Sequence, residues 1–242
     1  MSASVEGLEP ITCLHEGVLL EGRLAIPAGP GPFPAVLVVH SAFGLGGHIP
    51  AVAERLAAEG FLALAVDMYG SGAYSEDPDV VGGFVRPLWG NAARLRSRMG
   101  AWLATLRARE DVLPDGIAAI GYCFGGQCVL ELARGGGDVR AVVSFHGILT
   151  TDARAETGSV RAHVAVHTGS LDPHAPPDHV NALRDELTAA GASWQISEYS
   201  NACHAFTDPS ACSPESGRAY EPLADAISWS STIGLLSAAL KH

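Results

Sequence analysis

The sequence of 242 residues is poor in basic side chains and in cysteine. It has 15 lysine and arginine residues against 26 aspartate and glutamate residues, which gives a net charge of −11. This acidic excess argues against nucleic acid and anionic membranes as partners. Five cysteines are an odd number, and they show no zinc-ligand spacing. We therefore expect a reduced, cytoplasmic protein without a disulfide framework.

Long apolar runs, internal repeats and linkers are also missing. No stretch approaches 18 uninterrupted apolar residues, so the sequence predicts no segment that spans a bilayer. The opening MSASVEGLEP lacks the basic and apolar regions of a secretory signal. The composition, 48% hydrophobic and 17% charged, is typical of a folded core. We predict a single domain over residues 1–242.

Apolar strands alternate with amphipathic helices along most of the chain, which predicts an α/β fold with a mostly parallel sheet covered by helices on both faces. Residues 70–92 show no firm period and are predicted to form a cover loop. A hairpin is expected from His15 to Pro27, and the arginines of the helix at 91–109 are expected to form a solvated face. The predicted strands are 35–40, 61–67, 116–122, 139–147, 161–170 and 193–200, and the predicted helices are 49–59, 91–109, 123–133, 177–191 and 219–240.

The motif GYCFGG, from Gly121 to Gly126, follows a predicted buried strand. Small residues around a cysteine permit the tight strand-to-helix turn of a nucleophile elbow. Such a turn lifts the Cys123 sulfur clear of the sheet and sets it at a helix N-terminus, where the dipole favours the attacking thiolate. The alternative is a buried structural cysteine, which is what most cysteines are.

A thiol nucleophile needs a base, and that base needs an orienting acid. Two later strands run into LDPHAPPDH and SNACHAFTDP, which places Asp172 and His204 at the edge where parallel sheets bind ligands. We predict that His204 shares the thiol proton and that Asp172 holds its ring. Asp178 and Asp67 are rival acids, of which Asp67 comes too early in the chain order of this fold.

The other histidines are not predicted to be catalytic. His163 and His167 alternate on a strand and are expected to be packed, and His146 is a candidate pocket wall. His174 and His179 flank the predicted acid, but no further ligand falls at a recognisable metal spacing. We predict neither a metal nor a cofactor.

Acyl transfer also requires donors for a developing oxyanion. The backbone N–H groups of Phe124, in the elbow, and of Ala42, in the loop HSAFGLGG, are the predicted pair. The glycines of that loop let the backbone approach a ligand, although a turn alone could also require them. Phe43, Tyr74 and Trp89 are predicted to line an acyl pocket beneath the cover loop.

Together these residues resemble the dienelactone hydrolase family of α/β hydrolases over nearly the whole chain. PAVLVVHSAFGL, GFLALAVDMYGSG, GYCFGG, GSLDPHAPP and CHAFTDP occur in the family's order and spacing. The resemblance implies an open, mostly parallel sheet of about eight strands. It also implies a Cys–His–Asp triad, which falls on Cys123, His204 and Asp172.

The chain departs from that family at two positions near the predicted site. Dienelactone hydrolases have a glutamate, implied to help deprotonate the cysteine when substrate arrives, where this chain has Ser41. They have a basic residue soon after the histidine to hold a substrate carboxylate, where this chain has Asp208, which would repel one. Arg86 is a candidate to compensate, with a merely exposed arginine as the alternative.

The sequence therefore predicts a hydrolase that cleaves a small ester or lactone through an acyl-enzyme on Cys123. The alternative is a non-catalytic or redox-sensing relative that binds a small ligand through the same thiol. The sequence does not determine the oligomeric state or the physiological substrate.

Overall fold

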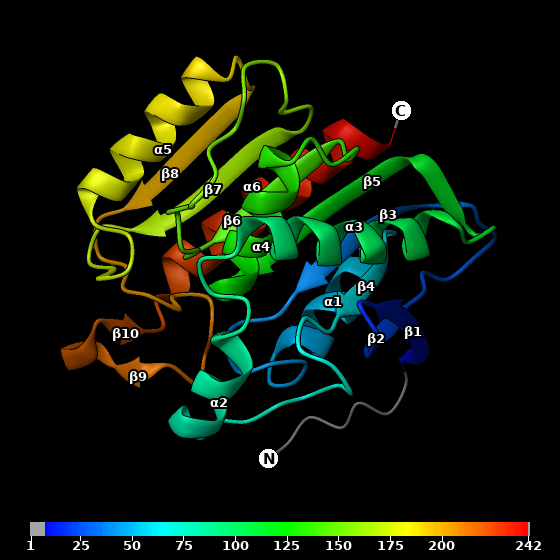
Figure 1. Cartoon of the computed structure of the whole chain (residues 1–242), viewed down its shortest axis with the longest axis horizontal. Helices are drawn as coiled ribbons and strands as arrows, with labels where there is room; N and C mark the ends of the chain where they lie inside the picture. Colours follow the sequence, from blue (N-terminus) through cyan, green and yellow to red (C-terminus); the bar gives the residue numbers. More distant parts are fainter. Residues whose placement is uncertain (1–7, 242) are drawn as a thin grey trace.

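Eight strands form one sheet in the order β1-β2-β4-β3-β5-β6-β7-β8 in the computed structural model, which describes residues 8–241 (Figure 1). A separate two-stranded sheet, which the sequence did not predict, pairs β10 with β9. The strands are β1 (Glu9–His15), β2 (Val18–Ala25), β3 (Phe33–Val39), β4 (Leu62–Val66), β5 (Val112–Tyr122), β6 (Ala141–Phe145), β7 (His163–Gly169), β8 (Trp194–Tyr199), β9 (Cys212–Ser213) and β10 (Arg218–Ala219).

The strands from β3 to β8 are parallel, whereas β1 and β2 form an antiparallel edge. Every residue of β4 and β6 is buried, as their solid runs of Val, Ala and Leu predicted. Parallel strands place their carboxyl ends at one edge of the sheet. The loops that follow β3, β5, β7 and β8 therefore meet at this edge.

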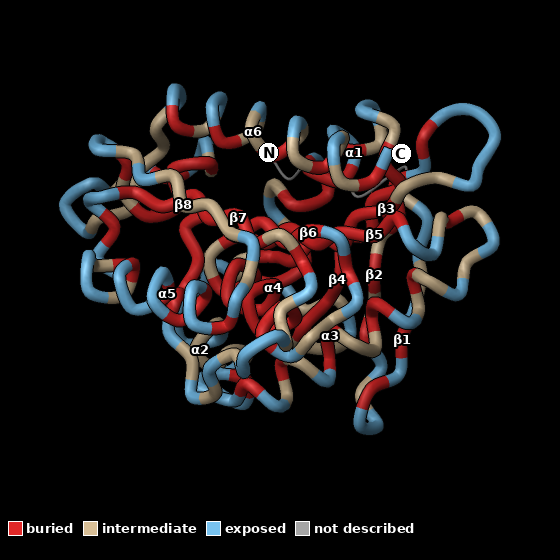
Figure 2. The backbone as a smooth tube through the Cα atoms, turned by 90° about the horizontal axis from the view of Figure 1, so that it is seen from above, coloured by how far each residue is buried: buried red, intermediate tan, exposed pale blue. Residues whose placement is uncertain are grey.

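Helices cover both faces of the sheet, as predicted. In Figure 2, α1 and α6 lie on one side of the strands, and α3, α4 and α5 lie on the other. Trp102 is buried on the α3 side and Leu56 on the α1 side. The helices are α1 (Ile49–Ala58), α2 (Pro78–Val85), α3 (Ala92–Arg107), α4 (Phe124–Arg134), α5 (Pro177–Ala189) and α6 (Pro222–Leu240).

Helix α6 is, within residues 8–241, the one helix long and apolar enough to cross a membrane by length and composition alone. It packs against β5 and β6, and its Leu236 and Leu240 are buried in the core beside the sheet. The helix begins at Pro222, later than the predicted 219, because β10 takes up the intervening segment. Its apolar side therefore completes the cover of the sheet.

Three local predictions were wrong. The hairpin does not run from His15 to Pro27, because β1 pairs with β2 around a turn at Glu16 and Gly17, both with positive φ. The stretch 70–92 contains α2, whose start is capped by the Asp77 side chain accepting from the Asp79 N–H. The third wrong prediction is the solvated arginine face of α3, in which Arg98 is buried.

Arg98 of α3 is 4% exposed rather than solvated. Its Nη1 donates to the Met68 carbonyl at 2.6 Å, and its Nε donates to His15 Nδ1 at 3.3 Å. A long basic side chain can lie in the interior when its donors find acceptors there. Helical periodicity alone did not reveal these partners.

Buried ion pairs connect α4 to α3 and α5. Glu131 accepts from Arg96 and from Arg134, both at 2.9 Å, and Arg134 also contacts Glu186 at 2.9 Å. The side chains of Arg134 and Glu131 are each 1% exposed, and that of Glu186 is 5% exposed. This network fixes the layer of helices beneath the nucleophile turn.

Replacing Arg134 with alanine leaves Glu186 without a cationic partner in the interior. Because breaking a buried pair costs about 3–5 kcal/mol, we predict that Arg134→Ala lowers the free energy of unfolding by about 3 kcal/mol or more. Urea denaturation measures this change. Arg107→Ala is the control, since the Arg107–Asp138 pair lies near the surface and is expected to contribute less than about 1 kcal/mol. Equal losses in the two variants would contradict the prediction.

Candidate active site

Cys123 lies at the sharp turn between β5 and α4, with φ 55° and ψ −114°. This backbone conformation is strained for any residue with a side chain. A Cβ on Gly121 would lie 2.1 Å from the Gly125 carbonyl oxygen, and one on Gly125 would lie 2.3 Å from the Val39 carbonyl oxygen. Both glycines are therefore needed for α4 to start directly above β5 and β3.

His204 and Asp172 lie in the loops after β8 and β7, at the same edge of the sheet as Cys123. His204 Nδ1 lies 2.8 Å from Asp172 Oδ2, and both residues are buried. Asp172 Oδ1 accepts the His174 N–H at 2.8 Å, which fixes the carboxylate. The structure thus brings together the three side chains that the sequence analysis selected.

The thiol of Cys123 is half-buried and lies beside the His204 ring. Burial opposes ionisation, but the charge of His204, its hydrogen bond and the nearby backbone N–H groups outweigh it and lower the pKa of Cys123. Burial likewise opposes charge on His204, yet the Cys123 thiolate and the Asp172 carboxylate raise the pKa of His204 to about 10. These interactions shift the Cys123–His204 pair toward thiolate and imidazolium.

Two backbone donors converge on the sulfur. The N–H groups of Ala42 and Phe124 both contact the Cys123 side chain and contribute to its lowered pKa. They belong to the loop after β3 and to the first residue of α4. An oxygen bonded to a carbon on this sulfur would lie within reach of both donors.

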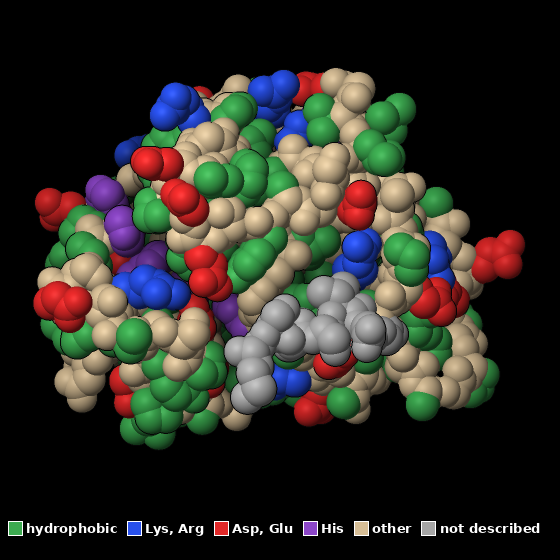
Figure 3. Space-filling view, turned by 90° about the horizontal axis from the view of Figure 1, so that it is seen from below, with side chains coloured by type: hydrophobic (Ala, Val, Ile, Leu, Met, Phe, Trp, Pro, Cys, Tyr) green, Lys and Arg blue, Asp and Glu red, His purple; other side chains and the backbone are tan. Residues whose placement is uncertain are grey.

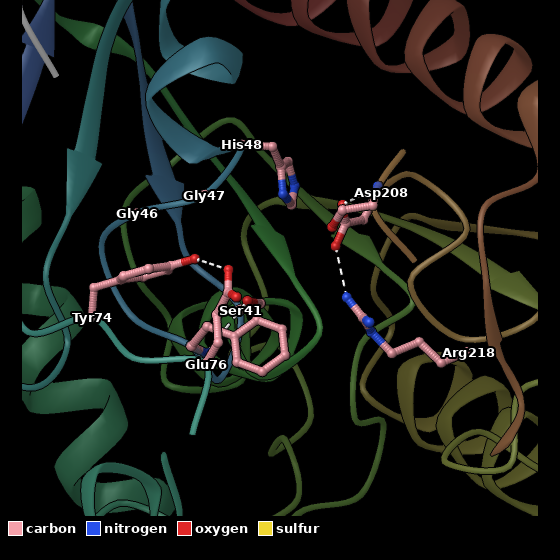
Figure 4. Close-up of a pocket in the computed structure, with 10 residues that line it drawn as sticks. Ser41, Gly46, Gly47, His48, Tyr74, Glu76, Asp208 and Arg218 are labelled. Carbon is pink, nitrogen blue, oxygen red and sulfur yellow. Dashed lines mark hydrogen bonds and ion pairs between the residues drawn. The ribbon is translucent and has the colours of Figure 1, made fainter. Parts of the chain in front are cut away.

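A cavity of about 350 Å³ opens next to the Ala42 loop (Figure 4); its lining includes Ser41 but not Cys123 or His204. Ser41, Phe43 and Tyr74 line it, whereas the other two predicted pocket residues, Arg86 and Trp89, are not among the lining residues. Arg86 is exposed at the end of α2, and Trp89 is 56% exposed. Neither side chain lines this cavity, and their role in substrate binding stays a prediction. The complete lining is Ser41, Phe43, Gly46, Gly47, His48, Tyr74, Glu76, Asp208, Ser210 and Arg218.

Arg218, on β10, is the basic residue of this cavity and was missed from the sequence. Its Nη2 donates to Asp208 Oδ2 at 2.8 Å, and the guanidinium lies 5.4 Å from the centre of the Phe43 ring. Asp208 Oδ1 also accepts from the N–H and the hydroxyl of Ser210. Asp208 is therefore a paired carboxylate rather than the free charge that the sequence suggested.

No sequence signal pointed to Arg218, because it reaches the site through backbone pairing. The His204 N–H donates to the Gly217 carbonyl at 2.8 Å, and the Ala219 N–H donates to the His204 carbonyl at 3.1 Å. A two-residue bridge of this kind leaves no hydrophobic period in the sequence.

Figure 3 shows acidic and basic side chains interspersed on one face of the molecule, with histidines gathered on one side of it.

Two other buried histidines lie near the site, one directly after β6 and one on β7. His146 is buried behind His204, with ring centres 5.2 Å apart, and its Nε2 lies 2.9 Å from Thr207 Oγ1. His167 is buried against Tyr199, as expected for a packed residue. Within the described part of the chain, no group of three or more His, Cys, Asp or Glu side chains is arranged to hold a metal ion.

The rival acids are occupied elsewhere. Asp67 is fully buried and accepts the backbone N–H groups of Tyr69, Gly70, Gly72 and Glu21. It therefore organises the turn after β4. Asp178 is exposed in the first turn of α5. Neither carboxylate is recorded in contact with the His204 ring, whose Nδ1 partner is Asp172.

The profile of the dienelactone hydrolase family matches residues 20–240. The chain belongs to this family. A solved dienelactone hydrolase-like promiscuous phosphotriesterase from metagenomic libraries is 35% identical, with a TM-score of 0.91 over 96% of this chain and 98% of that one. A protein of Escherichia coli O157:H7 named as a candidate carboxymethylenebutenolidase is 29% identical over 189 residues, 73% of this chain and 68% of its own length. The dienelactone hydrolase of Anabaena variabilis, 21% identical over 96% of this chain and 98% of that one, shares the fold with a TM-score of 0.68.

Membership of the dienelactone hydrolase family confirms both the resemblance and the fold that the sequence predicted. The eight-stranded, mostly parallel sheet with helices on both faces is that of an α/β hydrolase. This dienelactone hydrolase relative is accordingly a hydrolase. The family does not by itself assign the bond that is cleaved or the side chains that cleave it.

The lowered pKa of Cys123 predicts a pH dependence for its alkylation. Iodoacetamide reacts with thiolates, so alkylation of Cys123 should persist to lower pH than alkylation of an ordinary exposed cysteine. Removing the imidazolium raises the thiol pKa, so His204→Asn should slow alkylation at pH 7 by at least about tenfold and move its midpoint to higher pH. Peptide-resolved mass spectrometry separates Cys123 from the exposed Cys212, the internal control. An unchanged profile in His204→Asn would contradict the assignment of the pair.

Proposed function

We propose that this dienelactone hydrolase relative cleaves small, uncharged carboxylic esters or lactones through an acyl-enzyme on Cys123. One observation carries the proposal: a half-buried thiol at the strained turn lies beside a His204 ring that Asp172 holds at 2.8 Å, and His204 and two backbone N–H groups lower the pKa of this thiol. Acyl transfer needs a nucleophile, a proton carrier and oxyanion donors, and these groups are suited to the three tasks.

In the proposed acylation, the thiolate attacks the carbonyl carbon and forms a C–S bond, while the carbonyl π electrons move to oxygen. The Ala42 and Phe124 N–H groups donate to that oxyanion. As the carbonyl re-forms, the C–O bond to the alcohol breaks, and the His204 imidazolium gives the leaving oxygen its proton. Asp172 keeps the ring oriented throughout.

Deacylation reverses these roles with water. Neutral His204 takes a proton from a water molecule while the oxygen of that water attacks the thioester carbonyl carbon. Collapse of the second tetrahedral intermediate breaks the C–S bond, releases the acid and restores the thiolate beside the imidazolium. No cofactor is consumed, and the enzyme returns to its starting protonation state.

The charges around the cavity favour an uncharged substrate. Arg218 is neutralised by Asp208, and Glu76, which accepts the Tyr74 hydroxyl at 2.5 Å, adds a negative charge. Burial lowers the pKa of His48, so this histidine brings no compensating cation. A carboxylate-bearing substrate would therefore meet a net negative pocket in a chain of charge −11. The volume of about 350 Å³ is at the small end for ligand pockets.

Cys123→Ala removes the nucleophile and should abolish turnover of p-nitrophenyl acetate, with a loss of at least about 10⁴-fold in kcat. Circular dichroism should show the wild-type fold, because alanine fills the position without new bulk. Mass spectrometry after rapid mixing should find an acetyl group on Cys123 of the wild type. Turnover retained in Cys123→Ala would eliminate the mechanism.

Asp208→Asn should release Arg218 to bind an anion. We predict that kcat/KM for an ester with a carboxylate on its acyl chain rises about tenfold relative to a matched neutral ester. Asp208→Asn combined with Arg218→Gln should lose this gain. Asp178→Asn removes the same charge from an exposed helix and should leave the ratio unchanged. A similar gain in Asp178→Asn would assign the effect to the overall field instead.

Oxidation and acylation of Cys123 also test the alternative, a redox sensor. All five cysteines are free in the structure, at Cys13, Cys123, Cys128, Cys203 and Cys212. No observation on the site favours disulfide chemistry over acyl transfer. A reversible disulfide at Cys123 under mild oxidation, together with no acylation by activated esters, would favour the sensor.

A further inference from the structure

The Ala42 N–H lies in a loop, yet an oxyanion donor must keep its direction during the reaction. The N–H of Ala42 and the carbonyl of Ser41 belong to one planar peptide and point in opposite directions. Whatever holds the Ser41 carbonyl therefore aims the Ala42 N–H.

His40 holds that carbonyl. Its Nδ1 lies 2.6 Å from the Ser41 oxygen, while the Met68 N–H donates to its Nε2 at 3.0 Å. Because Nε2 accepts, the proton must be on Nδ1, which donates to Ser41. The ring is fully buried, and burial lowers the pKa of His40, so it remains neutral. The Gly44 N–H also reaches the Ser41 oxygen, at a longer 3.2 Å.

The peptide on the other side of Ala42 is held as well. The Tyr69 hydroxyl donates to the Ala42 carbonyl at 2.9 Å. The Tyr69 ring packs against His40 at 4.8 Å and against Phe124 at 5.6 Å between ring centres. Phe124, which supplies the other oxyanion donor, is 1% exposed in this cluster. Tyr69 thus contacts both donor residues, Ala42 through its hydroxyl and Phe124 through its ring.

We propose that His40 is a positioning residue of the oxyanion hole: its Nδ1–H fixes and polarises the Ser41–Ala42 peptide so that the Ala42 N–H donates to the reacting oxygen. This proposal rests on the proposed function, since it assigns a role within acyl transfer. Hydrogen bonds in series strengthen one another, so a donor on the carbonyl makes the amide N–H a better donor. His40 contacts no reacting atom itself.

A matched pair of variants separates this role from packing. Asparagine places an amide nitrogen near the position of Nδ1, so His40→Asn retains a donor to Ser41 but loses the acceptor for Met68. Glutamine reaches the position of Nε2, so His40→Gln retains the Met68 contact but loses the donor to Ser41. Both substitutions remove the ring, and therefore both lose the same aromatic packing.

We expect His40→Gln to lower kcat for p-nitrophenyl acetate at least about tenfold with little change in KM, since loss of a whole donor costs about 10²–10³-fold. His40→Asn should retain activity within about fivefold of the wild type. Thermal melts should place the two variants within a few degrees of each other. Similar activities for His40→Gln and His40→Asn, whether both high or both low, would overturn the proposal.

Alkylation of Cys123 by iodoacetamide provides the second readout, because displacement of iodide forms no oxyanion. Because the Ala42 N–H also helps to lower the pKa of Cys123, His40→Gln should move the midpoint of alkylation to higher pH. Above that midpoint, where the thiol is ionised in both proteins, the alkylation rate should change less than about threefold while ester turnover falls. A parallel loss of both reactions would indicate general damage and overturn the proposal. Cys123→Ala runs alongside as the reference: if it retains turnover, or if the wild type is not acylated, the proposed function fails first, and the role of His40 fails with it.

Discussion

The positive φ of Cys123 is the constraint on which the site depends. The turn is tolerated because Gly121 and Gly125 let β5, α4 and the end of β3 approach without Cβ atoms between them. It directs the sulfur away from the sheet, toward His204 and the Phe124 N–H. Ala205, directly after His204, also has a positive φ of 57°. Strain is therefore stored at Cys123 and directly beside His204, as at many functional sites.

Charge separation within the pair depends on a balance between burial and contacts. Burial opposes both ions, so each alone would be neutral, but each stabilises the other when they touch. Asp172 tips the balance toward the imidazolium, and backbone N–H groups tip it toward the thiolate. The donors that organise the resting sulfur are also those proposed to bind the oxyanion. Ground state and transition state therefore use the same fixed dipoles.

The sequence predicted those parts of the fold that depend on residues close together along the chain. Buried parallel strands read as solid apolar runs, and the elbow reads as small residues around Cys123. Asp172 and His204 followed from strand ends and chain order. The sequence could not reveal Arg98 or Arg218, because their acceptors are backbone carbonyls and carboxylates from distant segments. His40 was read only as the last residue of a strand, since its role depends on which peptide its ring contacts.

Two departures from the family pattern fit one physical change. The resemblance implies a glutamate where this chain has Ser41, so no carboxylate at that position is available to deprotonate the thiol when substrate arrives. His204 and the backbone N–H groups are the groups that lower the pKa of Cys123. With Asp208 pairing Arg218, no free cation awaits a substrate carboxylate. An anionic substrate would then find neither a cation that binds its carboxylate nor a glutamate that deprotonates the thiol in response to it. On the proposed function, an uncharged ester needs neither, because the groups around Cys123 lower its pKa and favour the thiolate before substrate binds.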